Sequence, residues 1–180
     1  MKVKTIVRIS ASIMISIVIS TAVFAKGKDF NYLRDGISFS IPEGWNVIAN
    51  DSIGENAYYF SAERTGNEAT GLITAVWINK VEDPKTTIAL HQKTMKAANI
   101  YRNPGIEFTA VIPDNFAGLK VKVVSCRYTT FVKGQKLDGM IYCFNSAYKT
   151  ISIFFQSGPD DQKLNQKAFD LVRQTFNCRE

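Results

Sequence analysis

Apolar and polar positions alternate through most of the chain after residue 29, and this pattern predicts half-buried β-strands. Residues 30–33 and 37–41 alternate in this way on either side of Arg34-Asp35-Gly36. Asp-Gly between two such segments is a strong signal for a β-hairpin. Pro42-Glu43-Gly44 ends the second strand. We expect Trp45, which follows, to be a core anchor, because large aromatic side chains beside strand ends usually bury.

Two more strands are predicted in the first half of the chain, at residues 57–62 and 72–78. The second of these is apolar on both faces, which places it at the centre of a sheet that is covered from each side. The second half of the chain predicts four further strands of an antiparallel set, at residues 106–112, 119–132, 137–144 and 150–156. Residues 113–118 are expected to turn the chain between the first two of them.

Two helices are predicted from apolar residues spaced three or four positions apart. Asp83-Pro84 has the composition of a helix N-cap followed by proline at the first helical position, and this helix should run to about Asn99. Its inward stripe would consist of Ile88, His91 or Gln92, Met95 and Ala98. The closing helix should begin near residues 157–160, with an inward stripe of Leu164, Ala168, Leu171, Val172 and Thr175 and with Phe176 at its end.

The predicted order of elements is β-β-β-β-α-β-β-β-β-α, which is typical of an α+β fold. We therefore expect an antiparallel β-sheet of about six to eight strands with helices packed on its faces. A chain of this size suits a single domain with one hydrophobic core, and no linker or repeat divides it.

The start of the chain has the layout of a cleavable signal peptide. Basic residues up to Arg8 precede an uncharged segment at 9–24, and Val23 and Ala25 stand at the −3 and −1 positions of a cleavage site after Ala25. This predicts a signal peptide at 1–25 and a single domain at 26–180 that is periplasmic or secreted. The uncharged segment contains serines and is shorter than the ~20 strongly apolar residues of a membrane span, so we expect no stable membrane anchor after cleavage.

The charge of the expected mature chain is mild. Cleavage removes Lys2, Lys4 and Arg8 from the 22 basic residues, which leaves 19 basic against 16 acidic residues, a net charge of +3. No cluster of Lys and Arg stands out along the sequence, and nucleic-acid binding is therefore not expected.

The segment from Asp35 to Trp45, Asp-Gly-Ile-Ser-Phe-Ser-Ile-Pro-Glu-Gly-Trp, resembles the opening "G-hydrophobic-x-F-x-hydrophobic-P-x-G-W" motif of the PsbP-like superfamily. The closing helix, which ends in Gln174-Thr175-Phe176, resembles the C-terminal helix of that superfamily, which also includes the DcrB and Ran-binding Mog proteins. The resemblance implies a PsbP-like α/β/α sandwich. It also implies a role in binding other proteins or in envelope assembly.

Catalytic candidates are few. His91 is the single histidine of the chain, so a catalytic triad must use it and a site with two histidine ligands cannot form. No G-x-S-x-G, H-E-x-x-H, phosphate-loop or EF-hand pattern is present, and most carboxylates fall in turns or helix caps. The sequence therefore predicts a protein that is not an enzyme and that has no catalytic residues, metal site or cofactor; a half-buried structural role is expected for His91.

Three cysteines, Cys126, Cys143 and Cys178, stand in the expected mature chain, where disulfides can form. If Gly134-Gln135 is a two-residue turn, Cys126 lies opposite Cys143 on a non-hydrogen-bonded rung, which can accept a cross-strand disulfide. The alternative is two reduced, buried and inert thiols. We expect Cys178 to be a free thiol or to lie at the end of the closing helix against Cys126 or Cys143.

These observations favour an exported, non-enzymatic domain that acts as a protein-interaction or envelope-assembly module, with another envelope or secreted protein as its partner. An alternative is a carrier that holds a small apolar ligand between sheet and helix, which would require a cavity of ~300 Å³ or more. A hydrolase that uses His91 is a third hypothesis. The ligand-binding residues are not predicted by the sequence.

Overall fold

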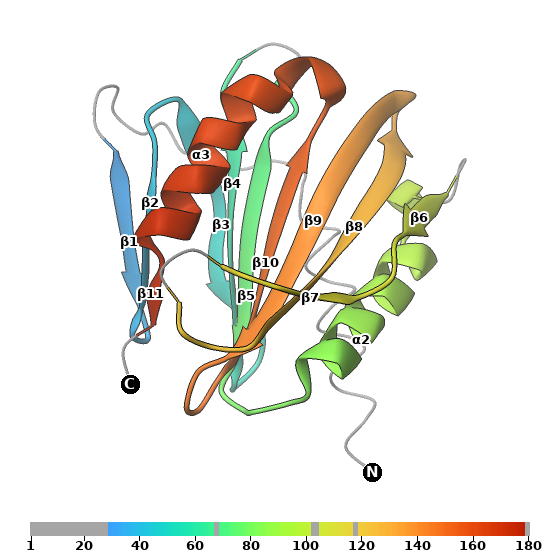
Figure 1. Cartoon of the computed structure of the whole chain (residues 1–180). Coiled ribbons are helices and arrows are strands. Elements are labelled where there is room, and N and C mark those ends of the chain that lie inside the picture. Colours follow the sequence, from blue (N-terminus) through green and yellow to red (C-terminus); the bar gives the residue numbers. More distant parts are fainter. Residues whose placement is uncertain (1–28, 67–68, 102–104, 117–118, 179–180) are drawn as a thin grey trace.

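Two antiparallel β-sheets and two long helices make up the described part of the protein (Figure 1). The computed structural model describes residues 29–66, 69–101, 105–116 and 119–178. The predicted signal peptide lies outside these residues. Helices on both faces of an antiparallel sheet confirm the predicted α+β fold, with a second, smaller sheet that the sequence did not predict.

The larger sheet has eight strands. Seven of them follow one another across the sheet in the order β3 (Trp45–Ser52), β4 (Ala57–Arg64), β5 (Leu72–Ile78), β10 (Thr150–Ser157), β9 (Gln135–Asn145), β8 (Val123–Val132) and β6 (Ile106–Phe108). The eighth strand, β7 (Ile112–Asp114), also pairs with β8. The central position of β5, with buried residues on both faces, confirms the interpretation of its uniformly apolar sequence.

The smaller sheet consists of β1 (Phe30–Arg34), β2 (Ile37–Ile41) and the short C-terminal strand β11 (Asn177–Cys178). Asp35 and Gly36 connect β1 to β2 and both have positive φ angles, 53° and 77°. This is the type I′ geometry that matches the twist of the flanking strands. The predicted hairpin is therefore confirmed.

The segment 106–112 is not one continuous strand, as the sequence predicted, but is divided into β6 and β7. The division occurs at Thr109, whose backbone N–H donates to the Arg127 carbonyl of β8 while its Oγ1 accepts from the Arg127 N–H at 3.0 Å. A side-chain oxygen thus takes the place of the backbone carbonyl that would continue the ladder. Pro113, which was expected in the turn, lies in β7, where an edge strand tolerates its missing N–H.

Helix α2 (Pro84–Ala97) begins where the sequence predicted and ends two residues earlier. The Asp83 carboxylate accepts a hydrogen bond from the Thr86 N–H at 2.9 Å, so Asp83 is the N-cap. Ile88, His91 and Met95 are buried against β8 and β9, which identifies His91 rather than Gln92 as the inward residue at its level.

Helix α3 (Gln162–Thr175) follows a short 3₁₀ turn, Pro159–Asp161. Its buried residues are Asn165, Ala168, Phe169 and Val172, whereas Leu164 is 57% exposed. The predicted stripe was therefore wrong at its start. The reason is that Asn165 and Phe169 have specific partners on β10: the Asn165 amide donates to Ser157 Oγ at 2.8 Å, and the Phe169 ring stacks on Phe155.

Two hydrophobic clusters lie on the two faces of the larger sheet. The first lies beneath α3 and the smaller sheet and is rich in aromatic rings, among them Phe39, Phe60, Trp77, Phe116, Phe144, Phe155 and Phe176. The second lies beneath α2 and includes Ile88, Met95, Tyr128 and Ile141. Trp45 is only partly buried and packs at the margin of the first cluster, with its ring centre 6.1 Å from that of Phe169.

Candidate functional site

The single histidine lies in the second hydrophobic cluster and contacts a serine that the sequence did not point to. His91 Nε2 is 2.9 Å from Ser152 Oγ, which in turn donates to Cys143 Sγ at 3.5 Å. All three side chains are buried, with exposed fractions of 8%, 2% and 0%. Burial lowers the pKa of His91 to about 4, so its imidazole is neutral at neutral pH. This chain of hydrogen bonds links α2 to the sheet inside the core, where substrate has no access to the hydroxyl.

The cysteines of β8 and β9 are not directly opposite each other. Val132 pairs with Gln135, which makes Lys133-Gly134 the two-residue turn, and Cys126 therefore lies opposite Ile141 and Cys143 opposite Val124. The predicted register was wrong because Gly134 occupies the second turn position of a type I′ turn, with φ 81°. Both cysteines still point into the core beneath α2, and all three cysteines are free thiols.

No cluster of three or more His, Cys, Asp and Glu side chains suited to a metal ion is found among the described residues. Neither α2 nor α3, the helices of the described part, has the length and apolar character that a membrane span requires.

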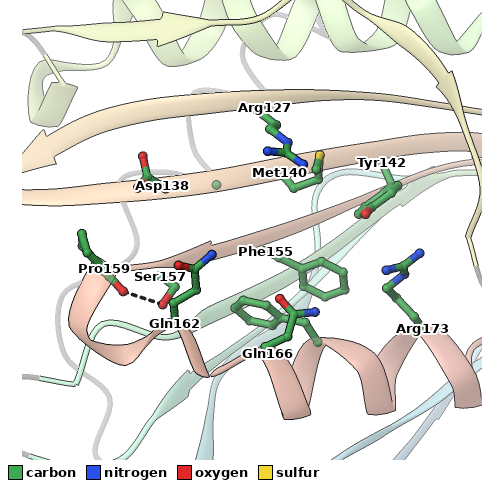
Figure 2. Close-up of a pocket in the computed structure, with 13 residues that line it drawn as sticks. Arg127, Asp138, Met140, Tyr142, Phe155, Ser157, Pro159, Gln162, Gln166 and Arg173 are labelled. Carbon is green, nitrogen blue, oxygen red and sulfur yellow. Dashed lines mark hydrogen bonds between the residues drawn. The ribbon is translucent and has the colours of Figure 1, made fainter. Parts of the chain in front are cut away.

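An open groove lies on the opposite side of the sheet, between α3 and strands β8, β9 and β10 (Figure 2). We call it the α3 groove. Its volume is about 200 Å³. It is lined by Arg127, Asp138, Gly139, Met140, Tyr142, Phe155, Ser157, Gly158, Pro159, Gln162, Gln166, Phe169 and Arg173.

Two arginines approach the α3 groove from different elements, Arg127 from β8 and Arg173 from α3 (Figure 2). The Arg173 guanidinium carbon is 5.4 Å from the ring centre of Tyr142, and Arg173 Nη2 donates to the Asn115 carbonyl at 3.3 Å. Burial raises the pKa of the Tyr142 hydroxyl, although Arg173 lowers it in part, so this hydroxyl stays protonated. This end of the groove therefore presents two guanidinium groups and a phenolic hydroxyl, all of which are hydrogen-bond donors.

The floor and the other wall of the groove have different characters. Met140 and Phe155 provide apolar surface, and Gln162 and Gln166 on α3 provide exposed amides (Figure 2). Asp138 lies at the groove margin, where it accepts a hydrogen bond from Thr129 at 2.7 Å and pairs with Lys136 at 3.4 Å. Both of its carboxylate oxygens are thus engaged by residues of β8 and β9.

The position of α3 relative to the sheet is fixed by a polar contact at its start. Asp161 forms an ion pair with Arg64 of β4 and accepts two hydrogen bonds from Thr70, from N–H and Oγ1, each at 2.9 Å. The Thr70 hydroxyl also accepts a hydrogen bond from the Gly158 N–H at 2.7 Å. Because these contacts connect α3 to β4 and to the segment before β5, the groove wall is held in place before any partner binds.

The sequence did not identify the groove, since its residues come from β8, β9, β10 and α3. The signal that was present is the alternation along β8, where the polar residues Ser125, Arg127 and Thr129 share one face and Cys126 and Tyr128 lie on the other. An arginine in the middle of a ten-residue strand indicates a surface exposed to solvent, but the sequence alone did not show that α3 would form the other wall.

No protein-family model matches the sequence, and no curated protein matches it. The fold is similar to that of solved structures. The cyanobacterial PsbP protein CyanoP from Synechocystis sp. PCC 6803 superposes with a TM-score of 0.58 at 13% identity, over 90% of this chain and 98% of that one.

LpqN of Mycobacterium tuberculosis, described as involved in cell envelope biogenesis, superposes with a TM-score of 0.53 at 9% identity, over 85% of this chain and 91% of that one. A protein from Bacteroides thetaiotaomicron superposes with a TM-score of 0.53 at 13% identity, over 87% of this chain but only 50% of that one. The eight-stranded antiparallel sheet, the helices on its two faces and these superpositions together establish that the chain has the PsbP-like fold.

Proposed function

We propose that this chain is an exported, non-enzymatic domain that binds another protein of the cell envelope through the α3 groove. The observation that carries the proposal is the groove itself, which is open, has a rigid helix as one wall and combines two arginines with an apolar floor. Protein interfaces favour such a combination of arginine and aromatic side chains. The predicted signal peptide supports an envelope location, and the description of LpqN as a protein of cell envelope biogenesis agrees with it.

A non-catalytic role is supported by the placement of the one histidine. A general base must reach the proton that it abstracts. His91 and Ser152 contact each other inside the core, where their exposed fractions of 8% and 2% leave no room for a substrate. We therefore favour a binding module over a hydrolase.

The alternative of a carrier for a small apolar ligand is less well supported. Small-molecule sites are usually enclosed and occupy ~300–1,000 Å³. The α3 groove has about 200 Å³, is open to solvent and carries charged and amide side chains on its walls. These properties suit a segment of a protein surface better than a buried apolar molecule.

Site-specific photocross-linking in the native host tests the proposal. p-Benzoylphenylalanine is introduced at Gln166, which is exposed in the groove, or at Lys93, which is equally exposed on α2 at the opposite face of the sheet. We expect an ultraviolet-dependent adduct with an envelope protein from position 166 and none from position 93. Absence of an adduct at 166, or the same adducts from both positions, would contradict the proposal.

A further inference from the structure

We infer that the segment bound in the α3 groove is an acidic, extended stretch of the partner protein, whose carboxylates are held by Arg127 and Arg173. This inference rests on the proposed function and adds the chemistry of the partner.

The two arginines have no carboxylate partner of their own among the described residues. Among the described residues, neither Arg127 nor Arg173 forms an ion pair. The acidic side chains near the groove are engaged elsewhere: Asp138 with Thr129 and Lys136, Asp170 with Gln166 at 2.8 Å, and Asp114 with Ser125 at 2.6 Å. None of these carboxylates lies within ion-pair distance of either guanidinium, so both guanidinium groups can bind a carboxylate from outside the chain.

Arg173 is already oriented for binding. Its guanidinium lies near the rings of Tyr142 and Phe116, at 5.4 and 5.9 Å from their centres, and the Asn115 carbonyl accepts one of its hydrogen bonds. A guanidinium has five N–H donors in a fixed fork that matches a carboxylate. Because the side chain is held before binding, less conformational entropy is lost when a carboxylate arrives.

The size and shape of the groove favour a peptide over a phospholipid as the bound anion. The groove is too small and too open to enclose an acyl chain, so a phospholipid would gain little from its apolar floor. Arg127 and Arg173 lie on different walls, with Met140 and Phe155 between the strands and the helix (Figure 2). An extended peptide can lie along such an open groove, with apolar side chains on the floor and with flexible glutamate side chains that reach the arginines beside it.

The experiment uses the purified chain and a fluorescein-labelled hexapeptide, Glu-Phe-Glu-Phe-Glu-Phe, with the Gln-Phe-Gln-Phe-Gln-Phe peptide as the matched uncharged probe. Fluorescence anisotropy at low ionic strength measures the affinity. We expect the glutamate peptide to bind about tenfold or more tightly than the glutamine peptide, as charge-assisted hydrogen bonds require. Arg127→Gln should weaken binding of the glutamate peptide about tenfold, since Arg127 is exposed and its loss leaves the core intact.

Three controls make the result specific. Lys93→Gln, a charge removal on the opposite face, should leave the affinity unchanged. Arg173→Lys keeps the charge and the stacking position but loses the planar fork, and it should weaken binding several-fold. Circular dichroism should show that each variant retains its fold. Equal binding of the two peptides, no measurable binding of the glutamate peptide, or an equal loss in Lys93→Gln would overturn the inference.

Binding to phosphatidylglycerol vesicles without binding to the glutamate peptide would also overturn it, in favour of a lipid. The adduct formed from position 166 separates this inference from the proposed function. If Arg127→Gln leaves that adduct undiminished, the partner lies in the groove but is not held through its carboxylates, and only the inference fails. If no adduct forms at all, the proposed function fails.

Discussion

The ring of Tyr128 on β8 lies directly over Gly139, its cross-strand partner on β9. A Cβ atom at residue 139 would come within 2.1 Å of Tyr128 Cζ, which is far shorter than any real contact. The absence of a side chain at this position allows Tyr128 to reach Gln156 on β10, to which its hydroxyl donates a hydrogen bond at 3.2 Å. The glycine thus determines how three strands pack beneath α2.

Gly139→Ala is expected to destabilise the protein by about 1–3 kcal/mol, because the added methyl group forces the Tyr128 ring out of its position. Urea denaturation measures the free energy of unfolding. In a Tyr128→Leu background the same substitution should cost much less, since the ring that it displaces is gone. An equal loss of unfolding free energy in both backgrounds would show that the Tyr128 ring does not exclude a side chain at residue 139.

The stability of the protein should fall in mildly acidic solution because of His91. Its pKa is lowered by burial from 6.5 in the unfolded chain to about 4 in the folded one. Between these values the unfolded chain binds more protons than the folded one, so stability is full above pH 6.5 and is lost as the pH falls towards 4. The loss contributed by this residue should be about 2 kcal/mol between pH 7 and pH 5.

His91→Gln is the matched variant for this effect, since glutamine is similar in size and does not titrate. The difference in unfolding free energy between wild type and variant, measured across this pH range, isolates the contribution of the histidine. Parallel pH profiles for the two proteins would show that His91 titrates normally in the folded state.

Cys126 and Cys143 are expected to remain thiols in the native protein. They are diagonal neighbours on one face of β8 and β9, where Cβ atoms lie well beyond the ~3.5–4.5 Å that a disulfide requires. Burial raises the pKa of Cys143 to about 11 and also raises that of Cys126, so neither is a reactive thiolate. Denaturation without reductant should therefore release three alkylatable thiols, counted by mass spectrometry.

Alkylation of Cys178 alone in that experiment would instead reveal a disulfide between Cys126 and Cys143. In the native state, iodoacetamide should react faster with Cys178, which is only partly buried, than with the other two cysteines.

The ion pair between Arg64 and Asp161 should hold α3 in place as a groove wall. Asp161→Asn removes the charge but keeps the shape, and it is expected to cost about 1.5–3 kcal/mol because hydrogen bonds to a partly buried charge are lost. Hydrogen exchange of the α3 amides should accelerate relative to those of α2. An Asp160→Asn control should change neither quantity, since Asp160 is exposed.

Several features of the fold could be predicted because they depend on neighbouring residues. The Asp35-Gly36 turn, the central strand β5 and the Asp83 cap of α2 each follow from local sequence, and each is found in the structure. The stripe of α3 was predicted less well. Asn165 is polar and was not expected inside, but Ser157 provides a hydrogen-bond partner for its amide.

The register of β8 and β9 shows how a small local ambiguity changes a tertiary contact. A turn at Lys133-Gly134 instead of Gly134-Gln135 moves each residue by two positions relative to its partner. The face of each residue is kept, because side chains alternate with a period of two. Both cysteines therefore point into the core as predicted, but they no longer lie opposite each other.

By itself, the sequence of this protein determined the β1–β2 hairpin, the central strand β5, the start of α2 and the faces on which Cys126 and Cys143 lie, because alternation, helical spacing and turn chemistry act over a few residues. Only the tertiary structure decided that Arg127 and Arg173 flank one groove and that His91 contacts Ser152. These pairs are brought together by strand order and helix packing, which depend on the burial of surfaces across the whole chain and not on any local pattern.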